Sequence, residues 1–68
     1  MRKLYKGYVK WFNNEDGIGW ITVDGMEDIF IHFSEILHDG YKTLEDGQLV
    51  TLDVERRNGG NYAFNVRI

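Results

Sequence analysis

Short runs of β-branched and aromatic residues alternate with glycine-containing breaks along the whole chain of 68 residues. The breaks recur at short intervals, at Gly17, Gly25, Gly40, Gly47 and Gly59–Gly60. Runs of this length between turn residues are typical of an all-β barrel or sandwich. The pattern predicts five strands, near residues 5–13, 18–23, 28–33, 48–56 and 61–67.

Two of the breaks have the composition of hairpin turns. The Asp-Gly pair in "VDGMED" and the Asn-Gly pair in "RNGGNY" tolerate positive φ, which tight turns between antiparallel strands require. The longest stretch without a strand pattern is "SEILHDGYKTLEDG". We expect it to begin with a short helical turn through Ile36 and Leu37, capped by the hydroxyl of Ser34, and to continue as a surface loop.

Length and composition indicate one small domain over residues 1–68. A chain this short hides only about 60% of the surface that its unfolded form exposes, so no deep catalytic cleft is expected. There is no cysteine, which excludes disulfides and cysteine-based zinc sites. The start, "MRKLYKGYVK", lacks an apolar segment, and no long apolar run follows. We therefore expect a cytoplasmic protein without a membrane span.

The net charge of −3 argues against a polyanionic partner, but the charges are unevenly distributed. Residues 1–14 carry four basic residues and no acid, residues 15–55 carry all eleven acids and one lysine, and residues 56–68 carry three arginines. Either the basic ends gather on one face of an acidic protein, or each end is solvated by itself. A bound nucleic acid would need more than charge, because few phosphates could be neutralised.

Alternation along two predicted strands places aromatic side chains on the outer face of the sheet. Successive side chains of a strand point to opposite sides, so Trp20 in "IGWITV" lies opposite the aliphatic residues. In "DIFIHF", Phe30 and His32 lie opposite Ile29, Ile31 and Phe33, which alternation assigns to the core. Small soluble domains seldom expose large aromatics, so this face is a candidate binding surface.

Alternation shows which side chains point into the core less clearly in the first predicted strand than in the fourth. In "YVKWFN", alternation cannot place both Trp11 and Phe12 outside, so either one is core or a bulge re-aims one of them. The fourth strand, "VTLDVE", is unambiguous, with Val50, Leu52 and Val54 expected inside.

Exposed rings on adjacent strands beside lysines are suited to single-stranded nucleic acid. Every base has a flat face, and stacking on an aromatic ring contributes about 1–3 kcal/mol per base. The alternative is that these aromatics fill the barrel core or form a dimer contact.

Other chemistries have little support. His32 and His38 lack the spacing and the further ligands of a metal site, and no nucleophile or paired carboxylate indicates an enzyme, so neither a metal nor another cofactor is expected. "DGIGWI" lacks the Lys-Ser/Thr of a phosphate loop and the third glycine of a dinucleotide fingerprint. We interpret it as part of the aromatic surface, with glycines that let bases approach closely.

Four motifs, "KWFN", "DGIGWI", "IFIHF" and "KTLEDGQ", occur in the order and spacing of a known family. Over nearly its entire length the chain resembles the cold-shock domain, a five-stranded antiparallel barrel of the OB type. The resemblance implies binding of single-stranded RNA and DNA, commonly pyrimidine-rich, by proteins that act as RNA chaperones, some of them as transcription antiterminators.

The resemblance also implies individual roles for residues of this chain. Base stacking is expected from Trp11, Trp20, Phe30, His32, Phe33 and Tyr41. Lys10 is expected at the nucleic-acid backbone, and Asp28 at the edge of a base. Phe12 lies beside Trp11, and Ile18 can touch a base, so both are included in the predicted site. For Phe33 the resemblance and the alternation argument disagree, and we follow the resemblance.

Departures from the family pattern lie at two places. Where the family usually has "KGFGF", this chain has "DGIGW", so Asp16 repels phosphate and Ile18 offers no flat face, whereas Trp20 enlarges the aromatic surface. Where the family usually has "GPQAANV", this chain has "GNYAFNV", so Tyr62 and Phe64 are unexpected, either as core or as additional contacts. A competing hypothesis is therefore a protein-interaction barrel with weakened nucleic-acid binding. The oligomeric state is left open between a monomer and a weak or strand-exchanged dimer.

Overall fold

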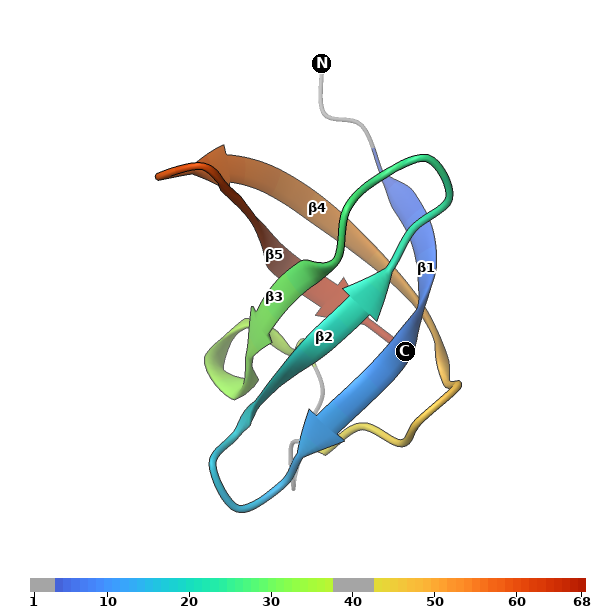
Figure 1. Ribbon diagram of the computed structural model, residues 1–68. Coiled ribbons are helices and arrows are strands. Elements are labelled where there is room, and N and C mark those ends of the chain that lie inside the picture. The colour runs from blue at the N-terminus through green and yellow to red at the C-terminus, as the bar shows by residue number, and fades with distance from the viewer. Residues whose placement is uncertain (1–3, 38–42) are drawn as a thin grey trace.

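The computed structural model describes residues 4–37 and 43–68 and forms a closed barrel of five strands (Figure 1). The strands are β1 (Tyr5–Asn13), β2 (Ile18–Thr22), β3 (Ile29–His32), β4 (Leu49–Arg57) and β5 (Gly60–Arg67). They follow one another around the barrel in the order β1-β2-β3-β5-β4. The five predicted strands are confirmed, with small differences at their ends.

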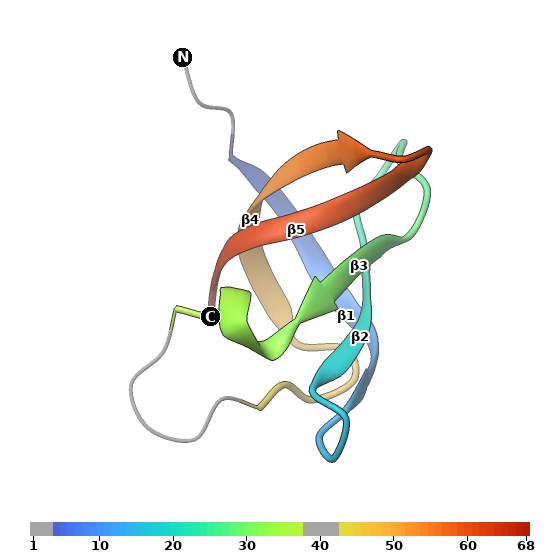
Figure 2. The same ribbon diagram turned by 90° about the vertical axis from the view of Figure 1, so that its left-hand side faces the viewer.

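The structure is the predicted five-stranded barrel of antiparallel type, and it closes through one pair of neighbouring strands that is parallel. β3 and β5 run side by side in the same direction, with Ile29 opposite Asn61 and Phe30 opposite Tyr62 (Figure 2). The other four pairs are antiparallel. The reason is geometric, because strand direction cannot alternate all the way around a closed ring with an odd number of strands. The parallel pair joins strands far apart in the sequence, as such pairs require.

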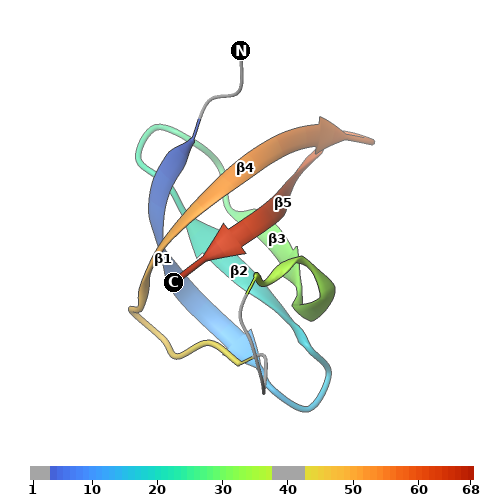
Figure 3. The ribbon, with the colours of Figure 1, turned by 180° about the vertical axis from the view of Figure 1, so that it is seen from behind.

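Both glycine-containing turns adopt the conformation that their sequences predict. Gly25 lies between β2 and β3 with φ of 79°, and Asn58 and Gly59 between β4 and β5 have φ of 50° and 78°. Positive φ at two successive residues is the geometry of the tight turns that favour Asn-Gly. Figure 3 shows the β4–β5 hairpin from behind.

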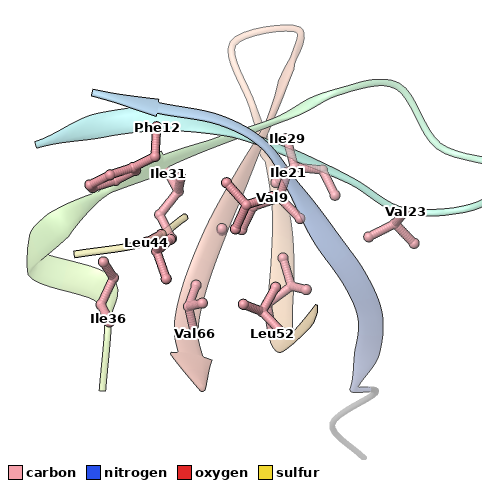
Figure 4. Close-up of a cluster of buried hydrophobic side chains, with 12 residues drawn as sticks. Val9, Phe12, Ile21, Val23, Ile29, Ile31, Ile36, Leu44, Leu52 and Val66 are labelled. Atoms are coloured by element: carbon pink, nitrogen blue, oxygen red, sulfur yellow. The ribbon is translucent and has the colours of Figure 1, made fainter. Parts of the chain in front are cut away.

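The inward side chains of all five strands form one hydrophobic core (Figure 4). The aliphatic residues predicted inside β2 and β3 are there, since Ile21, Ile29 and Ile31 are fully buried. Val50 and Leu52 of β4 are buried as predicted, whereas Val54 is only partly buried. Val9, Val23, Ile36, Leu44, Ala63 and Val66 complete the cluster together with Phe12.

A β-bulge in β1 decides between Trp11 and Phe12. The register of β1 against β2 shifts between Val9 and Trp11, so Lys10 and Trp11 both lie outside. Trp11 is 45% exposed, and Phe12 is 7% exposed, with its ring in the core beside Ile31 (Figure 4). The side chain of Phe12, which the predicted binding site includes, therefore points into the barrel and not toward the outer face.

A short 3₁₀ helix, η1 (Phe33–Glu35), follows β3 directly and changes the direction of the chain. Its cap is His32, whose Nδ1 accepts a hydrogen bond from the backbone N–H of Ser34 at 3.2 Å. The prediction that Ser34 caps a turn through Ile36 and Leu37 was wrong, since Ser34 lies inside the turn and Leu37 instead donates to the carbonyl oxygen of Val66. Within the described ranges, no helix is long and apolar enough to cross a membrane.

Candidate nucleic-acid interface

Four aromatic side chains lie at the same level on four neighbouring strands. Trp11 of β1 is opposite Trp20 of β2, Trp20 is opposite Phe30 of β3, and Phe30 is opposite Tyr62 of β5. We call Trp11, Trp20, Phe30 and Tyr62 the aromatic row. Outward residues directly opposite each other in a sheet share one face, so the row crosses β1, β2, β3 and β5, which are four of the five strands of the barrel.

Three rings of the row, those of Trp20, Phe30 and Tyr62, contact one another edge to face. Trp20 and Phe30 have ring centroids 5.6 Å apart at an interplanar angle of 76°, and Phe30 and Tyr62 are 5.9 Å apart at 73°. Such pairs stabilise the fold by roughly 0.5–1.5 kcal/mol each beyond their buried area. Trp20, Phe30 and Tyr62 are therefore held by their mutual contacts before any ligand binds, although all four members of the row remain accessible to solvent.

A second group of outward side chains lies at the end of β3. The rings of His32 and Phe33 have centroids 4.6 Å apart, and Ile18 of β2 lies opposite His32. Phe33 is 43% exposed, because β3 ends at His32 and η1 turns the next side chain outward. Phe33 therefore lies outside the core, as the resemblance implied, and not inside it, as simple alternation predicted.

The two glycines of "DGIGWI" serve packing within the protein and not the approach of a base. A Cβ atom at Gly17 would lie 2.5 Å from the Cδ1 atom of Phe33, and φ at Gly17 is 71°. A Cβ atom at Gly19 would lie 2.3 Å from the carbonyl oxygen of Trp11 and 2.8 Å from the Cα of Phe12. Gly17 therefore makes room for the Phe33 ring, and Gly19 lets β1 and β2 pack closely, which corrects our interpretation of this motif.

Lys10 and Asp28, predicted to contact different parts of a nucleic acid, are each other's partners. Lys10 Nζ donates a hydrogen bond to Asp28 Oδ2 at 2.8 Å, and both side chains remain exposed. The hydrogen bond to Asp28 and its negative charge raise the pKa of Lys10 above its usual value. The lysine is therefore fully charged at neutral pH, and a nucleic acid must compete with Asp28 for it.

The remaining charges do not form a single basic face in the described part of the chain. Arg57 pairs with Glu55 at 3.0 Å and lies over the ring of Phe64, 5.0 Å from its centroid. Lys6 and Arg67 lie on either side of Thr51 on the β1–β4–β5 side of the barrel. Asp16, at the tip of the β1–β2 hairpin, accepts a hydrogen bond from Asn13 Nδ2 at 3.2 Å.

Among the cavities that described residues line, two lie on different sides of the barrel. One of about 210 Å³ opens beside the aromatic row, between Trp20, Phe30 and Tyr62. The larger, of about 430 Å³, lies between β1 and β4, where Tyr8 and Leu49 line it. Among the residues that the structure covers, no group of three or more His, Cys, Asp or Glu side chains is arranged to hold a metal ion.

Most predicted site residues lie on one face of the barrel. The structure places Lys10, Trp11, Trp20, Asp28 and Phe30 at or beside the aromatic row, and Ile18, His32 and Phe33 next to the end of β3. Tyr41 lies outside the described residues, and Phe12 belongs to the core. Tyr62 was not in the predicted site, because the parallel register that places it opposite Phe30 joins distant segments.

Comparisons with known proteins agree with this fold and arrangement. Residues 5–68 match the family described as the 'Cold-shock' DNA-binding domain. The chain is 57% identical over 60 residues to Cold shock-like protein CspB of Bacillus cereus, covering 88% of this chain and 92% of the relative. It is 51% identical over 63 residues to Cold shock protein CspD of Bacillus subtilis, covering 93% and 96% of the two chains.

A solved structure, Drosophila Unr CSD456, is similar in fold. It superposes with a TM-score of 0.79 at 18% sequence identity, over 97% of this chain and 26% of the Unr chain. At this level of identity the likeness concerns the fold alone.

Proposed function

Since the chain belongs to the cold-shock domain family, which binds single-stranded nucleic acid, we propose that the aromatic row and the rings at the end of β3 form its binding surface. The observation that carries this proposal is the cross-strand register of Trp11, Trp20, Phe30 and Tyr62. Each ring lies on a separate strand, so successive bases of an extended strand can stack along the row.

Magnitudes favour stacking over charge as the main source of affinity. At about 1–3 kcal/mol per stacked base, three or four stacks outweigh what one paired lysine contributes at the surface. Lys10 follows directly before Trp11 of the row and pairs with Asp28, and its contact with a phosphate requires that this exposed ion pair opens. We therefore expect binding that depends only moderately on salt concentration.

The finer function that this surface supports is that of an RNA chaperone. A protein that holds open strands by stacking, without nucleotide hydrolysis, melts weak RNA structure by mass action. We propose a preference for pyrimidine-rich RNA and DNA, a cytoplasmic location, and a role in keeping transcripts single-stranded that includes transcription antitermination. We propose that the protein acts as a monomer or as a weak or strand-exchanged dimer.

Substitution of rings on this face tests the proposal. Phe30→Ala or His32→Ala should weaken binding of a short oligo-pyrimidine by about 1–3 kcal/mol, or roughly 5- to 150-fold in Kd, because each removes one stacking ring. The measurement is quenching of Trp fluorescence at low salt, with far-UV circular dichroism to verify folding.

The matched control is Tyr8→Ala, which removes an exposed ring that lines the cavity between β1 and β4. It should leave affinity unchanged. If Tyr8→Ala and Phe30→Ala weakened binding equally, the aromatic row would not be the binding surface.

The competing function, a protein-interaction barrel, has support in the acidic tip of the β1–β2 hairpin. Asp16 and Glu15 are exposed there, at the end of the surface that a phosphate backbone would cross. This alternative predicts no oligonucleotide binding even at low salt, together with self-association or partner binding through the aromatic row. The same fluorescence titration, combined with analytical ultracentrifugation, separates the two functions.

A further inference from the structure

Tyr62 distinguishes this chain from the family pattern and adds a ring to β5. The parallel register places it directly opposite Phe30, and its ring contacts that of Phe30 at 73°. Without Tyr62, the aromatic row would end at β3. The residue therefore extends the row from β3 onto β5, the strand that runs parallel to β3 (Figure 2).

The cavity of about 210 Å³ lies at this extension, and we call it the β3–β5 hollow. Its lining combines three aromatic residues with three residues that have polar side chains and one glycine, namely Trp20, Phe30, Tyr62, Glu27, Asp28, Asn61 and Gly60. It is smaller than the cavities of roughly 300–1,000 Å³ that enclose whole small ligands. Its size and open shape suit one flat ring that lies at the surface while its chain continues outside.

We propose that the β3–β5 hollow is an additional base site, in which Tyr62 stacks on a nucleobase that carries an exocyclic amino group. The proposal rests on the proposed function and assigns Tyr62 and Glu27 as residues that determine base preference. The ring of Tyr62 supplies the flat face, and the carboxylate of Glu27 supplies the hydrogen-bond acceptor.

The chemistry of the carboxylate sets the expected preference. An ionised carboxylate only accepts hydrogen bonds, whereas the amide of Asn61 both donates and accepts. Cytosine presents an amino donor at the position where uracil and thymine present a carbonyl acceptor. A cytosine in the hollow therefore gains a hydrogen bond from its amino group to Glu27, while a uracil places two acceptors against each other. Adenine shares the amino donor and follows cytosine in this respect.

A substitution series tests both residues. The probes are hexauridylate and six variants of it with a single cytidine at each position in turn, measured by fluorescence quenching. For the natural chain, one position should bind on the order of tenfold more tightly with cytidine than with uridine, because one charge-assisted hydrogen bond is gained. Glu27→Gln should abolish that preference, because its amide can serve either base.

Tyr62→Leu should weaken binding of every probe by about tenfold, because it keeps apolar bulk but removes the flat face, and Tyr62→Phe should bind like the natural chain. Tyr8→Leu, at an exposed ring away from the row, is the matched control and should have no effect. Equal affinity of Tyr62→Leu and the natural chain, or equal binding of all cytidine variants, would overturn the inference.

The outcomes also separate this inference from the proposed function. If the natural chain bound none of the probes, the proposed function would fail and the hollow with it. If Phe30→Ala weakened binding but Tyr62→Leu did not, only the hollow would fail. If circular dichroism shows that Tyr62→Leu is unfolded, the test rests on Glu27→Gln, whose position is exposed. Retention of the cytidine preference in Glu27→Gln would overturn the proposal.

Discussion

At the scale of single residues, the proposed binding face depends on two glycines, whose lack of a side chain lets other groups pack closely. Gly17 leaves space for the Phe33 ring, and Gly19 leaves space for the backbone of β1 at Trp11 and Phe12. The close approach at Gly19 occurs next to the bulge that turns Trp11 outward, so the same contact supports both the core and the exposed ring. Close packing at Gly17 therefore helps to position the ring of Phe33, and close packing at Gly19 helps to position Trp11.

Gly19→Ala should be strongly destabilising. The added Cβ would lie 2.3 Å from the carbonyl oxygen of Trp11, and a backbone atom cannot move away without separating β1 from β2. A barrel of this size has roughly 3–5 kcal/mol of stability, so we expect the variant to be largely unfolded at 25 °C. Urea denaturation followed by Trp fluorescence measures the effect.

Gly60→Ala provides the matched control for that experiment. Its Cβ would meet its nearest neighbours, among them the carbonyl oxygen of Arg57, at an ordinary distance of 3.8 Å. This variant should change the free energy of unfolding by less than about 1 kcal/mol. Similar losses in the two variants would show that strand conformation, and not the close approach at Gly19, is responsible.

At the scale of elements, the β1–β2 hairpin combines strong and weak binding features. The bulge exposes Trp11, and register places Trp20 beside it, while the tip of the hairpin carries Asp16 and the half-buried Ile18. Asp16 contributes a negative charge near the path of a phosphate backbone, and Ile18 has no flat face for a base. If the proposed surface binds nucleic acid, we expect the hairpin to lower affinity at its tip and to raise it at Trp11 and Trp20.

The double substitution Asp16→Lys with Ile18→Phe should tighten binding. The new ring adds a stack worth about 1–3 kcal/mol, and the new lysine steepens the dependence of log affinity on log salt concentration by about 0.7. Titrations of an oligo-pyrimidine at several salt concentrations measure both quantities.

Asp24→Lys is a control with the same change of charge as Asp16→Lys, at an exposed residue that lines the cavity between β1 and β4. This variant should leave the dependence of log affinity on log salt concentration nearly unchanged, because salt screens a charge on that side of the barrel from the bound nucleic acid. An unchanged affinity of the double variant would exclude residues 16 and 18 from the binding surface.

At the scale of the whole molecule, folding and binding are coupled through the barrel. The aromatic row has members on β1, β2, β3 and β5, so its geometry exists only when the parallel β3–β5 seam is closed. An unfolded chain does not hold these rings in line. A single-stranded ligand therefore binds the folded state and raises the free energy of unfolding by mass action.

Thermal unfolding measures this coupling. An oligo-pyrimidine at one hundred times its Kd should stabilise the protein by about 2.7 kcal/mol, which corresponds to a rise in Tm of roughly 10–20 °C for a domain of this size. Phe30→Ala at the same ligand concentration should show a smaller rise, because its Kd is larger. Equal increases for the two proteins, in circular dichroism melts, would contradict binding at the aromatic row.

The sequence by itself determined the strands, the tight turns and the outward positions of Trp20, Phe30 and His32. These features depend on local chemistry, namely the two-residue period of a strand and the tolerance of Gly and Asn for positive φ. Only the tertiary structure decided the outward position of Trp11, the pairing of Lys10 with Asp28 and the place of Tyr62 beside Phe30. Each depends on a bulge or on register between strands, and closure of a ring with five strands sets that register through contacts between distant segments.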